Sequence, residues 1–276
     1  MRLKTLSGLL VCAVLASPAV LPTQQTQKYK PEVGQEGKDV IWVPTPEELV
    51  EAMLDMAQVT AQDYVVDLGA GDGRIAIAAA KRGARALGVE FNPDMVALSR
   101  ENAVTAGVGD KAAFLQGDIF ETDFSRATVV TMYLLPDLNL RLRPRILEMK
   151  PGTRVVSHSF SMGEWEADRT VNIEYRTAYL WIVPANVEGT WTWTEASGDA
   201  ELTLRQSFQK VEGRLTIGSR EHPLTSVKLE GDRIVLAVSE DPGQTREYSG
   251  RIEGDILRGT VKVADKPAAE WSAKRR

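Results

Sequence analysis

The sequence predicts an α/β fold with a Rossmann-like sheet of seven strands, followed by a small antiparallel all-β domain. Between residues 63 and 160, short apolar runs rich in β-branched residues alternate with helical patterns. Such alternation is typical of a parallel sheet covered by helices on both faces. After Pro184 no long helical pattern follows, and short alternating segments are separated by glycine-containing turns. This second pattern favours an antiparallel meander or barrel.

The first expected helix begins near residue 45. Thr45 is the type of residue that caps a helix, Pro46 suits the first helical position, and Glu48 lies three residues after the cap. Leu49, Met53 and Met56 then recur at helical spacing, so we expect them to lie on one face of the helix.

The elements of the sheet follow in a regular series. Apolar runs predict strands at 64–68, 86–90, 112–116, 127–133 and 153–158, and helical patterns predict helices at 75–82, 93–106 and 138–149. Two last strands are expected near 171–176 and 178–183. The segment that precedes them is too short for a substantial helix, so we expect the helix of this connection to be reduced.

The C-terminal part is predicted to consist of strands alone. The run "TWTWT" at 190–194 has strict period two. We expect Trp191 and Trp193 to face the core of this domain or its junction with the first, and a ligand-binding wall is the alternative. Three units, "KVEGRLTI", "KLEGDRIVL" and "RIEGDILRGTV", each predict a turn at Glu-Gly. We place the domain boundary so that the sheet domain spans 40–184 and the β domain 185–276.

The N-terminus has the layout of a secretory signal. Arg2 and Lys4 precede the apolar run 6–15, and small residues follow up to Ala19. That run is too short to span a bilayer as a lasting helix. Cleavage would leave a periplasmic or secreted protein, whereas an uncleaved leader would leave a membrane-anchored or cytoplasmic one. We assign residues 1–19 to the signal and 20–39, rich in Gln, Lys, Pro and Gly, to a linker.

Charge and composition exclude several kinds of site. The net charge of −5 becomes −7 without the leader, with 31 basic against 38 acidic residues, which argues against a large nucleic-acid surface. Cys12, the only cysteine, lies in the leader, so disulfides, cysteine nucleophiles and cysteine-bound zinc are not expected. His158 and His222 are the only histidines and lie far apart in the sequence, so no metal site is predicted.

The stretch "VVDLGAGDGR" at 65–74 reads as a strand that ends in a glycine loop. A dinucleotide fingerprint would place its third glycine at position 74, which is Arg74, and no Gly-Lys-Ser/Thr phosphate loop follows. NAD and ATP are therefore not the expected cofactors. The loop residues expected to lie against the cofactor are Gly69, Ala70, Gly71 and Gly73.

Acidic residues at the ends of three successive strands suit S-adenosylmethionine, which has an ammonium group, a ribose diol and an adenine amine but no phosphate. Asp67 is placed to orient the methionine end, Glu90 to accept hydrogen bonds from the ribose hydroxyls, and Asp118 to accept from the adenine amine. Phe91 and Ile119 are placed to flank the adenine. The sequence therefore predicts S-adenosylmethionine as the cofactor.

A family resemblance agrees with this prediction. The run "VVDLGAGDGRIAIAAAKRGARALGVEFNPDMVALSRENA" resembles class I seven-strand methyltransferases, and the resemblance extends over about 40–184. The segments "WVPTPEELVEAML", "VVTMYLLPDLNLRLRPRI" and "GTRVVSHSFSMGEW" are similar to lysine methyltransferases of the ATP-synthase c-subunit type, and more distantly to seven-strand histone lysine methyltransferases. The resemblance implies a protein lysine as methyl acceptor, Thr45 in a loop over the cofactor, and a methyl-transfer channel lined by 133–136.

Two residues are candidates for a catalytic role. Tyr133 follows the strand at 127–133, and His158 ends the strand at 153–158 at the same edge of the sheet. Core packing is the alternative for Tyr133, and a hydrogen-bonded structural role is the alternative for His158. The stretch "MYLLPD" lacks the Asn/Asp-Pro-Pro-aromatic pattern of adenine N6 methyltransferases, so nucleic-acid methylation is not expected. A small-molecule methyltransferase, and an exported binding protein that reuses the fold without turnover, are the two alternative functions.

Overall fold

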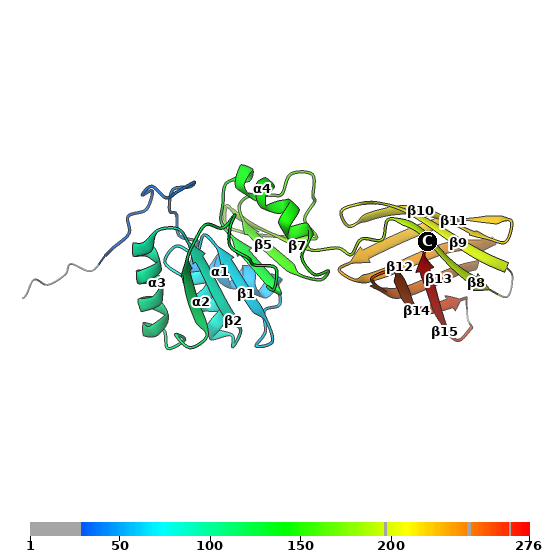
Figure 1. Cartoon of the computed structure of the whole chain (residues 1–276), viewed down its shortest axis with the longest axis horizontal. Helices are drawn as coiled ribbons and strands as arrows, with labels where there is room; N and C mark the ends of the chain where they lie inside the picture. Colours follow the sequence, from blue (N-terminus) through cyan, green and yellow to red (C-terminus); the bar gives the residue numbers. More distant parts are fainter. Residues whose placement is uncertain (1–28, 196–197, 242–243, 265) are drawn as a thin grey trace, which may run out of the picture. The chain divides into compact units, whose positions relative to one another are not determined.

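The computed structural model describes residues 29–195, 198–241, 244–264 and 266–276 (Figure 1). The predicted signal at 1–19 and the first part of the predicted linker lie outside these ranges. Within them, no helix is long and apolar enough to cross a membrane. The described chain forms two sheets, one of seven strands and one that closes into a barrel.

The elements of the seven-stranded sheet follow the predicted order; two strands have the predicted bounds, and the ends of the other elements differ by at most three residues. Its strands are β1 (Tyr64–Leu68), β2 (Arg85–Glu90), β3 (Ala112–Gln116), β4 (Val129–Met132), β5 (Arg154–His158), β6 (Arg169–Ile173) and β7 (Arg176–Ile182). Its helices are α1 (Glu47–Met56), α2 (Arg74–Lys81), α3 (Pro93–Thr105) and α4 (Pro136–Leu147). The connection from β5 to β6 contains no helix, which goes further than the reduced helix that the sequence predicts.

The strand order is β3-β2-β1-β4-β5-β7-β6. Strands β1 to β5 pair in parallel, while β7 is antiparallel to both of its neighbours, so the sheet is mixed. Because β1, β2, β3 and β4 are parallel, their carboxyl ends meet at one edge. The order also reverses beside β1, and ligands bind at such a switch point in open α/β sheets.

Two apolar clusters cover the two faces of this sheet. Val65 belongs to the cluster formed with α1, α2 and α3, whereas its neighbour Val66 belongs to the cluster formed with α4. Successive strand residues point to opposite faces, so a strand buried on both sides is apolar throughout. Leu49 and Met53 of α1 are fully buried, and both lie on the face that their spacing predicts.

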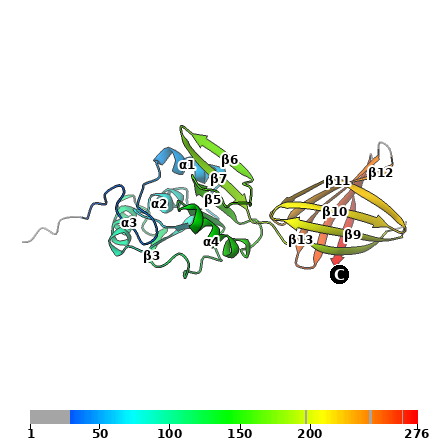
Figure 2. The same cartoon turned by 90° about the horizontal axis from the view of Figure 1, so that it is seen from above.

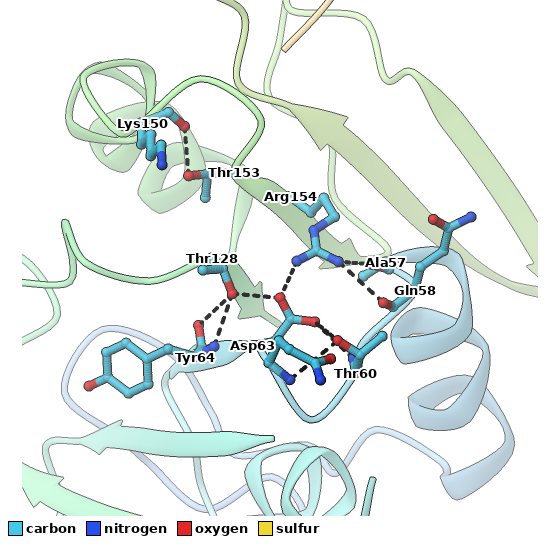
Figure 3. Close-up of polar contacts among 10 residues, drawn as sticks. Ala57, Gln58, Thr60, Asp63, Tyr64, Thr128, Lys150, Thr153 and Arg154 are labelled. Atoms are coloured by element: carbon cyan, nitrogen blue, oxygen red, sulfur yellow. Dashed lines mark hydrogen bonds and ion pairs between the residues drawn. The ribbon is translucent and has the colours of Figure 1, made fainter. Parts of the chain in front are cut away.

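At the amino ends of the parallel strands, a polar network around Asp63 connects β1 to the segments beside it (Figure 3). The Asp63 carboxylate accepts hydrogen bonds from the Thr60 backbone N–H at 2.8 Å and the Thr128 hydroxyl at 2.7 Å, and it pairs with the Arg154 guanidinium. Arg154 also donates to the Ala57 carbonyl at 2.6 Å. Burial raises the pKa of Asp63, but these hydrogen bonds outweigh it and hold the pKa below its usual value.

The C-terminal part is an eight-stranded closed barrel in which every strand pairs with its sequence neighbours (Figure 2). Its strands are β8 (Gly189–Glu195), β9 (Gly198–Ser207), β10 (Lys210–Ile217), β11 (Arg220–Glu230), β12 (Arg233–Asp241), β13 (Gln244–Glu253), β14 (Ile256–Val263) and β15 (Ala269–Arg275). The barrel closes where β8 pairs with β15 at Thr192–Lys274 and Trp191–Arg275. Trp191 is fully buried in the barrel core and Trp193 packs against that core, which confirms the core alternative for this pair.

One predicted turn in this domain is wrong. The segment "KVEGRLTI" is a single strand, β10, and its Glu-Gly lies opposite β9. A Cβ on Gly213 would lie 2.2 Å from the Thr203 carbonyl oxygen, so this glycine permits close approach of two backbones and makes no turn. The other two Glu-Gly pairs do end strands, since Gly231 and Gly254 adopt φ of 60° and 65°.

Candidate active site

A pocket lies at the carboxyl ends of β1 to β4, where the sequence predicts that the acidic residues converge. The predicted cofactor residues that line it are Thr45, Asp67, Gly69, Ala70, Gly71, Glu90, Phe91, Asp118 and Ile119. Tyr133 lines it too, whereas Gly73 and His158 do not. The segment 35–45 covers the remaining wall, although the sequence predicts only a linker up to residue 39.

The glycine loop is shaped by its contacts with β2 and with Trp42. The backbone N–H groups of Gly69 and Ala70 both donate to the Val89 carbonyl, at 2.9 and 3.0 Å. Gly71 has φ of 55°, and a Cβ there would lie 2.6 Å from the Trp42 indole nitrogen. Trp42 thus packs directly on the loop, a contact made possible by the missing side chain.

Gly73 serves the packing of the fold. It precedes α2 with φ of 85°, and a Cβ there would lie 2.7 Å from the Phe114 ring and 2.8 Å from Ser99. The third glycine therefore lets α2 approach β3 and α3 closely, and it does not reach the pocket.

Arg74, the residue that departs from the dinucleotide pattern, ties the loop to the segment before α1. Its guanidinium donates to both Asp72 carboxylate oxygens, at 3.0 and 2.6 Å, and to the Thr45 carbonyl at 2.8 Å. The loop residue Asp72 is held from its other side by the Asn102 amide, which donates to the Asp72 carbonyl at 2.9 Å. The loop is therefore fixed from both sides.

Glu90 bridges the glycine loop and the start of α3. One carboxylate oxygen accepts from the Gly71 N–H at 2.9 Å, and the other accepts from the Asn92 N–H at 2.9 Å. Asn92 in turn caps α3, because its side chain accepts from the Asp94 N–H at 2.9 Å. Each oxygen of a carboxylate accepts more than one hydrogen bond, so Glu90 keeps the capacity to bind a diol.

Asp67 is almost fully buried at the end of β1. It accepts a hydrogen bond from the Thr131 hydroxyl at 2.7 Å on the neighbouring strand. The pKa of Asp67 is raised to about 7, chiefly by burial; the charges of Glu90 and Asp72 contribute to the rise, and the hydrogen bond from Thr131 opposes it. A carboxylate destabilised in this way favours a cation beside it.

Asp118 lies in the segment that follows β3. It contacts Lys38, which belongs to the segment 35–45 that covers the pocket (the covering segment). Lys38 Nζ lies 2.7 Å from one Asp118 oxygen, and the Phe120 N–H donates to the other at 2.8 Å. These bonds hold the pKa of Asp118 below its usual value. Lys38 Nζ also lies 5.3 Å from the centre of the Phe91 ring, so this lysine faces two of the three residues predicted to contact adenine.

Three aromatic rings, those of Tyr133, His158 and Phe160, are stacked on the side of the pocket where the methyl-transfer channel is expected. The Tyr133 ring lies 3.7 Å from the His158 ring at an interplanar angle of 30°, and 6.2 Å from the Phe160 ring at 21°. His158 is buried behind Tyr133, and its Nδ1 is 3.0 Å from the Thr45 hydroxyl oxygen. The prediction that Thr45 caps α1 is wrong: Pro46 holds the cap position, where no side chain makes a capping hydrogen bond, and the Thr45 hydroxyl lies against His158 instead.

His158 is held in its neutral form. The pKa of the imidazole is lowered to about 4, mainly by burial and in addition by the charge of Arg176. A group with so low a pKa is a weak acceptor for the proton of an alkylammonium, so this environment favours a supporting role beside Tyr133.

The loop that carries Phe160 is held by the buried Asn139 of α4. The Asn139 amide nitrogen lies within hydrogen-bond distance of the Ser157 hydroxyl, the Phe160 carbonyl and the Ser161 carbonyl, at 3.1–3.2 Å. The loop turns sharply here, since Ser159 has φ of 63°. No local sequence pattern marks Asn139, Lys38 or Trp42 as site residues.

The donor set fits a cationic nucleoside rather than a phosphate cofactor. Asp67, Glu90 and Asp118 present carboxylates to the pocket, while the cations of Arg74 and Lys38 are each engaged by an aspartate. A polyphosphate would be repelled by this wall, whereas an ammonium or sulfonium would be stabilised. Across the described ranges, no group of three His, Cys, Asp or Glu side chains is arranged to hold a metal ion.

Comparisons with known proteins agree with this geometry. A family profile described as "ANTKMT methyltransferase domain" matches residues 67–169. The chain is 44% identical over 151 residues to the "Protein-lysine N-methyltransferase" of Saccharolobus islandicus (strain REY15A), a match that covers 52% of this chain and 94% of that protein. It is 34% identical over 145 residues to the Mus musculus lysine N-methyltransferase of the ATP-synthase c-subunit, which covers 52% of this chain and 58% of the mouse protein.

A solved structure supports the cofactor assignment. A crystal structure described as an RNA methyltransferase from Salinibacter ruber, in complex with S-adenosyl-L-homocysteine, is 52% identical in sequence. The match has a TM-score of 0.52 and covers 52% of this chain and 96% of that one. The chain belongs to the S-adenosylmethionine-dependent methyltransferase family that includes the protein-lysine N-methyltransferase of Saccharolobus islandicus.

Proposed function

We propose that this protein transfers the methyl group of S-adenosylmethionine to the ε-amino group of a lysine in another protein. The observation that carries the proposal is that the carboxylate-lined cofactor pocket opens beside Tyr133 into a groove that Tyr133 and Phe160 line. Two curated relatives, from Saccharolobus islandicus and mouse, are named as lysine N-methyltransferases, which agrees with this arrangement.

The cofactor supplies an electrophilic methyl on a sulfonium: the lysine lone pair forms the N–C bond as the C–S bond breaks, and the amine proton passes to solvent. The chain's own task is to bind, align and desolvate. Asp67, Glu90 and Asp118 would hold the two ends of the cofactor, and Trp42 covers the glycine loop. Tyr133, supported by His158, presents an aromatic face that excludes water from the amine and favours its neutral form.

RNA is the second candidate acceptor, because the Salinibacter ruber protein that is 52% identical is described as an RNA methyltransferase. Two observations favour lysine. The net charge is −5, and the exposed carboxylates Glu36 and Asp39 stand at the groove beside Tyr133. An RNA backbone approaching this rim would meet like charge.

The two acceptors can be separated in one experiment. The full chain is incubated with methyl-labelled S-adenosylmethionine and an extract of the native host, then divided into protease-treated and nuclease-treated halves. We expect the label to survive nuclease, to be lost with protease, and to map to lysine Nε by tandem mass spectrometry. Label in RNA alone would overturn the lysine proposal and support the second candidate. A Tyr133→Ala variant that still binds cofactor is expected to lose the transfer.

We further propose that the leader at 1–19 directs export and is removed. The support is the arrangement of Arg2, Lys4 and the apolar run 6–15. The N-terminal residue of the protein purified from its native host tests this. We expect Val20 to be the first residue, and a chain that starts at Met1 in the cytoplasmic fraction would contradict it.

A further inference from the structure

A second groove opens from the cofactor pocket beside Tyr133. Tyr133, Leu134 and residues 36–41 line both the pocket and this groove, whereas Leu135 and Phe160 line the groove alone. Because the two share a wall, a side chain that lies along the groove ends at the cofactor pocket next to the Tyr133 ring.

The rim of this groove is apolar and exposed. Ile41 keeps 58% of its surface exposed, Leu135 keeps 47% and Val43 keeps 37%. They come from two separate segments, the covering segment and the start of α4, yet they converge on one groove. Large apolar side chains gathered around a concave site are typical of a contact surface for another molecule.

Acidic groups stand among these apolar side chains. Glu36 and Asp39 line the groove and are exposed, and Asp39 lies 3.2 Å from Lys38, whose ammonium is held by Asp118. A cation that enters along the apolar wall therefore approaches carboxylates. Charge and shape together suit a side chain with an alkyl stem and a positive end.

We propose that this groove selects lysines that have an apolar residue beside them in the sequence. The inference rests on the proposed function and adds the substrate class. The lysine stem lies against Tyr133 and Phe160, while the neighbouring apolar side chain packs on Ile41 and Leu135. The occupant is thus a segment of another protein in which a lysine is flanked by large apolar residues.

The test compares two synthetic peptide sets that contain one central lysine each, flanked by leucine in one set and by serine in the other. Methyl transfer to each set is measured as kcat/KM for the full chain, for Leu135→Ser and for Val104→Ser. Leu135 lines the groove but not the cofactor pocket, and Val104 of α3 is 72% exposed and lines neither, so it is the matched control. Affinity for S-adenosylmethionine is measured for all three proteins by calorimetry.

We expect the leucine-flanked set to be preferred about tenfold by the wild type and by Val104→Ser, in line with the burial of one apolar side chain. Leu135→Ser should reduce this preference to about twofold without changing cofactor affinity. Equal rates on both peptide sets would overturn the inference while leaving lysine methylation intact. If the cofactor binds but no lysine in either set is methylated, the proposed function fails and the inference with it. Methylation of an added oligoribonucleotide in place of the peptides would contradict both.

Discussion

The Thr45 hydroxyl oxygen and the His158 Nδ1 are 3.0 Å apart in the buried layer behind the acceptor site. The contact joins the segment before α1 to the end of β5, two segments 113 residues apart in the sequence. Since the His158 ring stacks on the Tyr133 ring, this hydrogen bond fixes the orientation of the imidazole on which Tyr133 packs.

Thr45→Val should therefore disturb the site without removing a pocket carboxylate. The variant leaves the buried imidazole nitrogen without its partner, which costs about 1–3 kcal/mol of unfolding free energy. We expect a loss of that size in urea denaturation, together with reduced methyl transfer. Thr45→Ser keeps the hydroxyl and is the matched control, expected to stay within about 1 kcal/mol of wild type. Equal stabilities of the two variants would show that the hydrogen bond contributes nothing.

Asp67→Asn should stabilise the fold at alkaline pH and weaken cofactor binding. Burial raises the pKa of Asp67 to about 7, against 3.8 for an unperturbed aspartate. The folded state therefore binds more protons than the unfolded state in this range, and stability falls as the pH rises from about 4 through 7. The variant cannot ionise and escapes this loss.

We expect the unfolding free energy of Asp67→Asn to exceed that of wild type by about 1–3 kcal/mol at pH 8, with the difference shrinking toward pH 4. Urea denaturation at pH 4, 6 and 8 measures this. A difference that does not depend on pH would mean that Asp67 is ionised throughout.

Asp63→Asn should lower the free energy of unfolding at neutral pH, the opposite of the effect of Asp67→Asn. Asp63 lies just before β1, at the amino ends of the parallel strands and away from the pocket. The Thr60, Thr128 and Arg154 hydrogen bonds hold the pKa of Asp63 below the unfolded value of 3.8. Its contribution is thus present at neutral pH and is lost only as the pH falls below about 4. Loss of a largely buried ion pair costs about 2–4 kcal/mol, so we expect a destabilisation of that order at pH 7. Cofactor affinity should be unchanged, and a marked loss of affinity would contradict a purely structural role.

Asn139→Ala should separate binding from turnover. Its amide holds the loop that carries Phe160, and it lines neither the cofactor pocket nor the groove. A small displacement of an aligned acceptor site costs roughly 10–100-fold in rate, so kcat on lysine peptides should fall by about that factor. Cofactor affinity should stay within about twofold. Asn139→Asp should lower kcat further, because it places a carboxylate oxygen, a hydrogen-bond acceptor, opposite the Phe160 and Ser161 carbonyls. Unchanged kcat in both variants would exclude a positioning role.

The sheet and three of the carboxylates could be predicted because their signals are local. Asp67, Glu90 and Asp118 each end or follow a strand, and parallel strands bring their carboxyl ends together. The ends of elements were predicted less well, as at α4, which begins at Pro136, a proline in its first turn, instead of at residue 138.

The rest of the site depends on contacts between distant segments. Lys38 and Trp42 lie in a stretch without periodicity, and their partners Asp118 and Gly71 are set by how that stretch crosses the pocket. Thr45 has the local features of a helix cap, but a tertiary bond to His158 takes its hydroxyl. Gly213 looks like a turn residue, yet it is needed where β9 passes close to β10. None of these partners is visible in the surrounding residues of the sequence.

The assignment of this pocket to S-adenosylmethionine is tested most directly by calorimetric titration of the cofactor into wild type, Glu90→Gln and Glu148→Gln. Glu90 lines the pocket and contacts the glycine loop, whereas Glu148 is exposed at the end of α4 and serves as the control. Loss of charge-assisted hydrogen bonds worth about 1.5–3 kcal/mol predicts roughly 10–100-fold weaker binding for Glu90→Gln. Wild type and Glu148→Gln should bind equally. Equal affinity of all three proteins, or no binding by wild type, would contradict the assignment of this pocket.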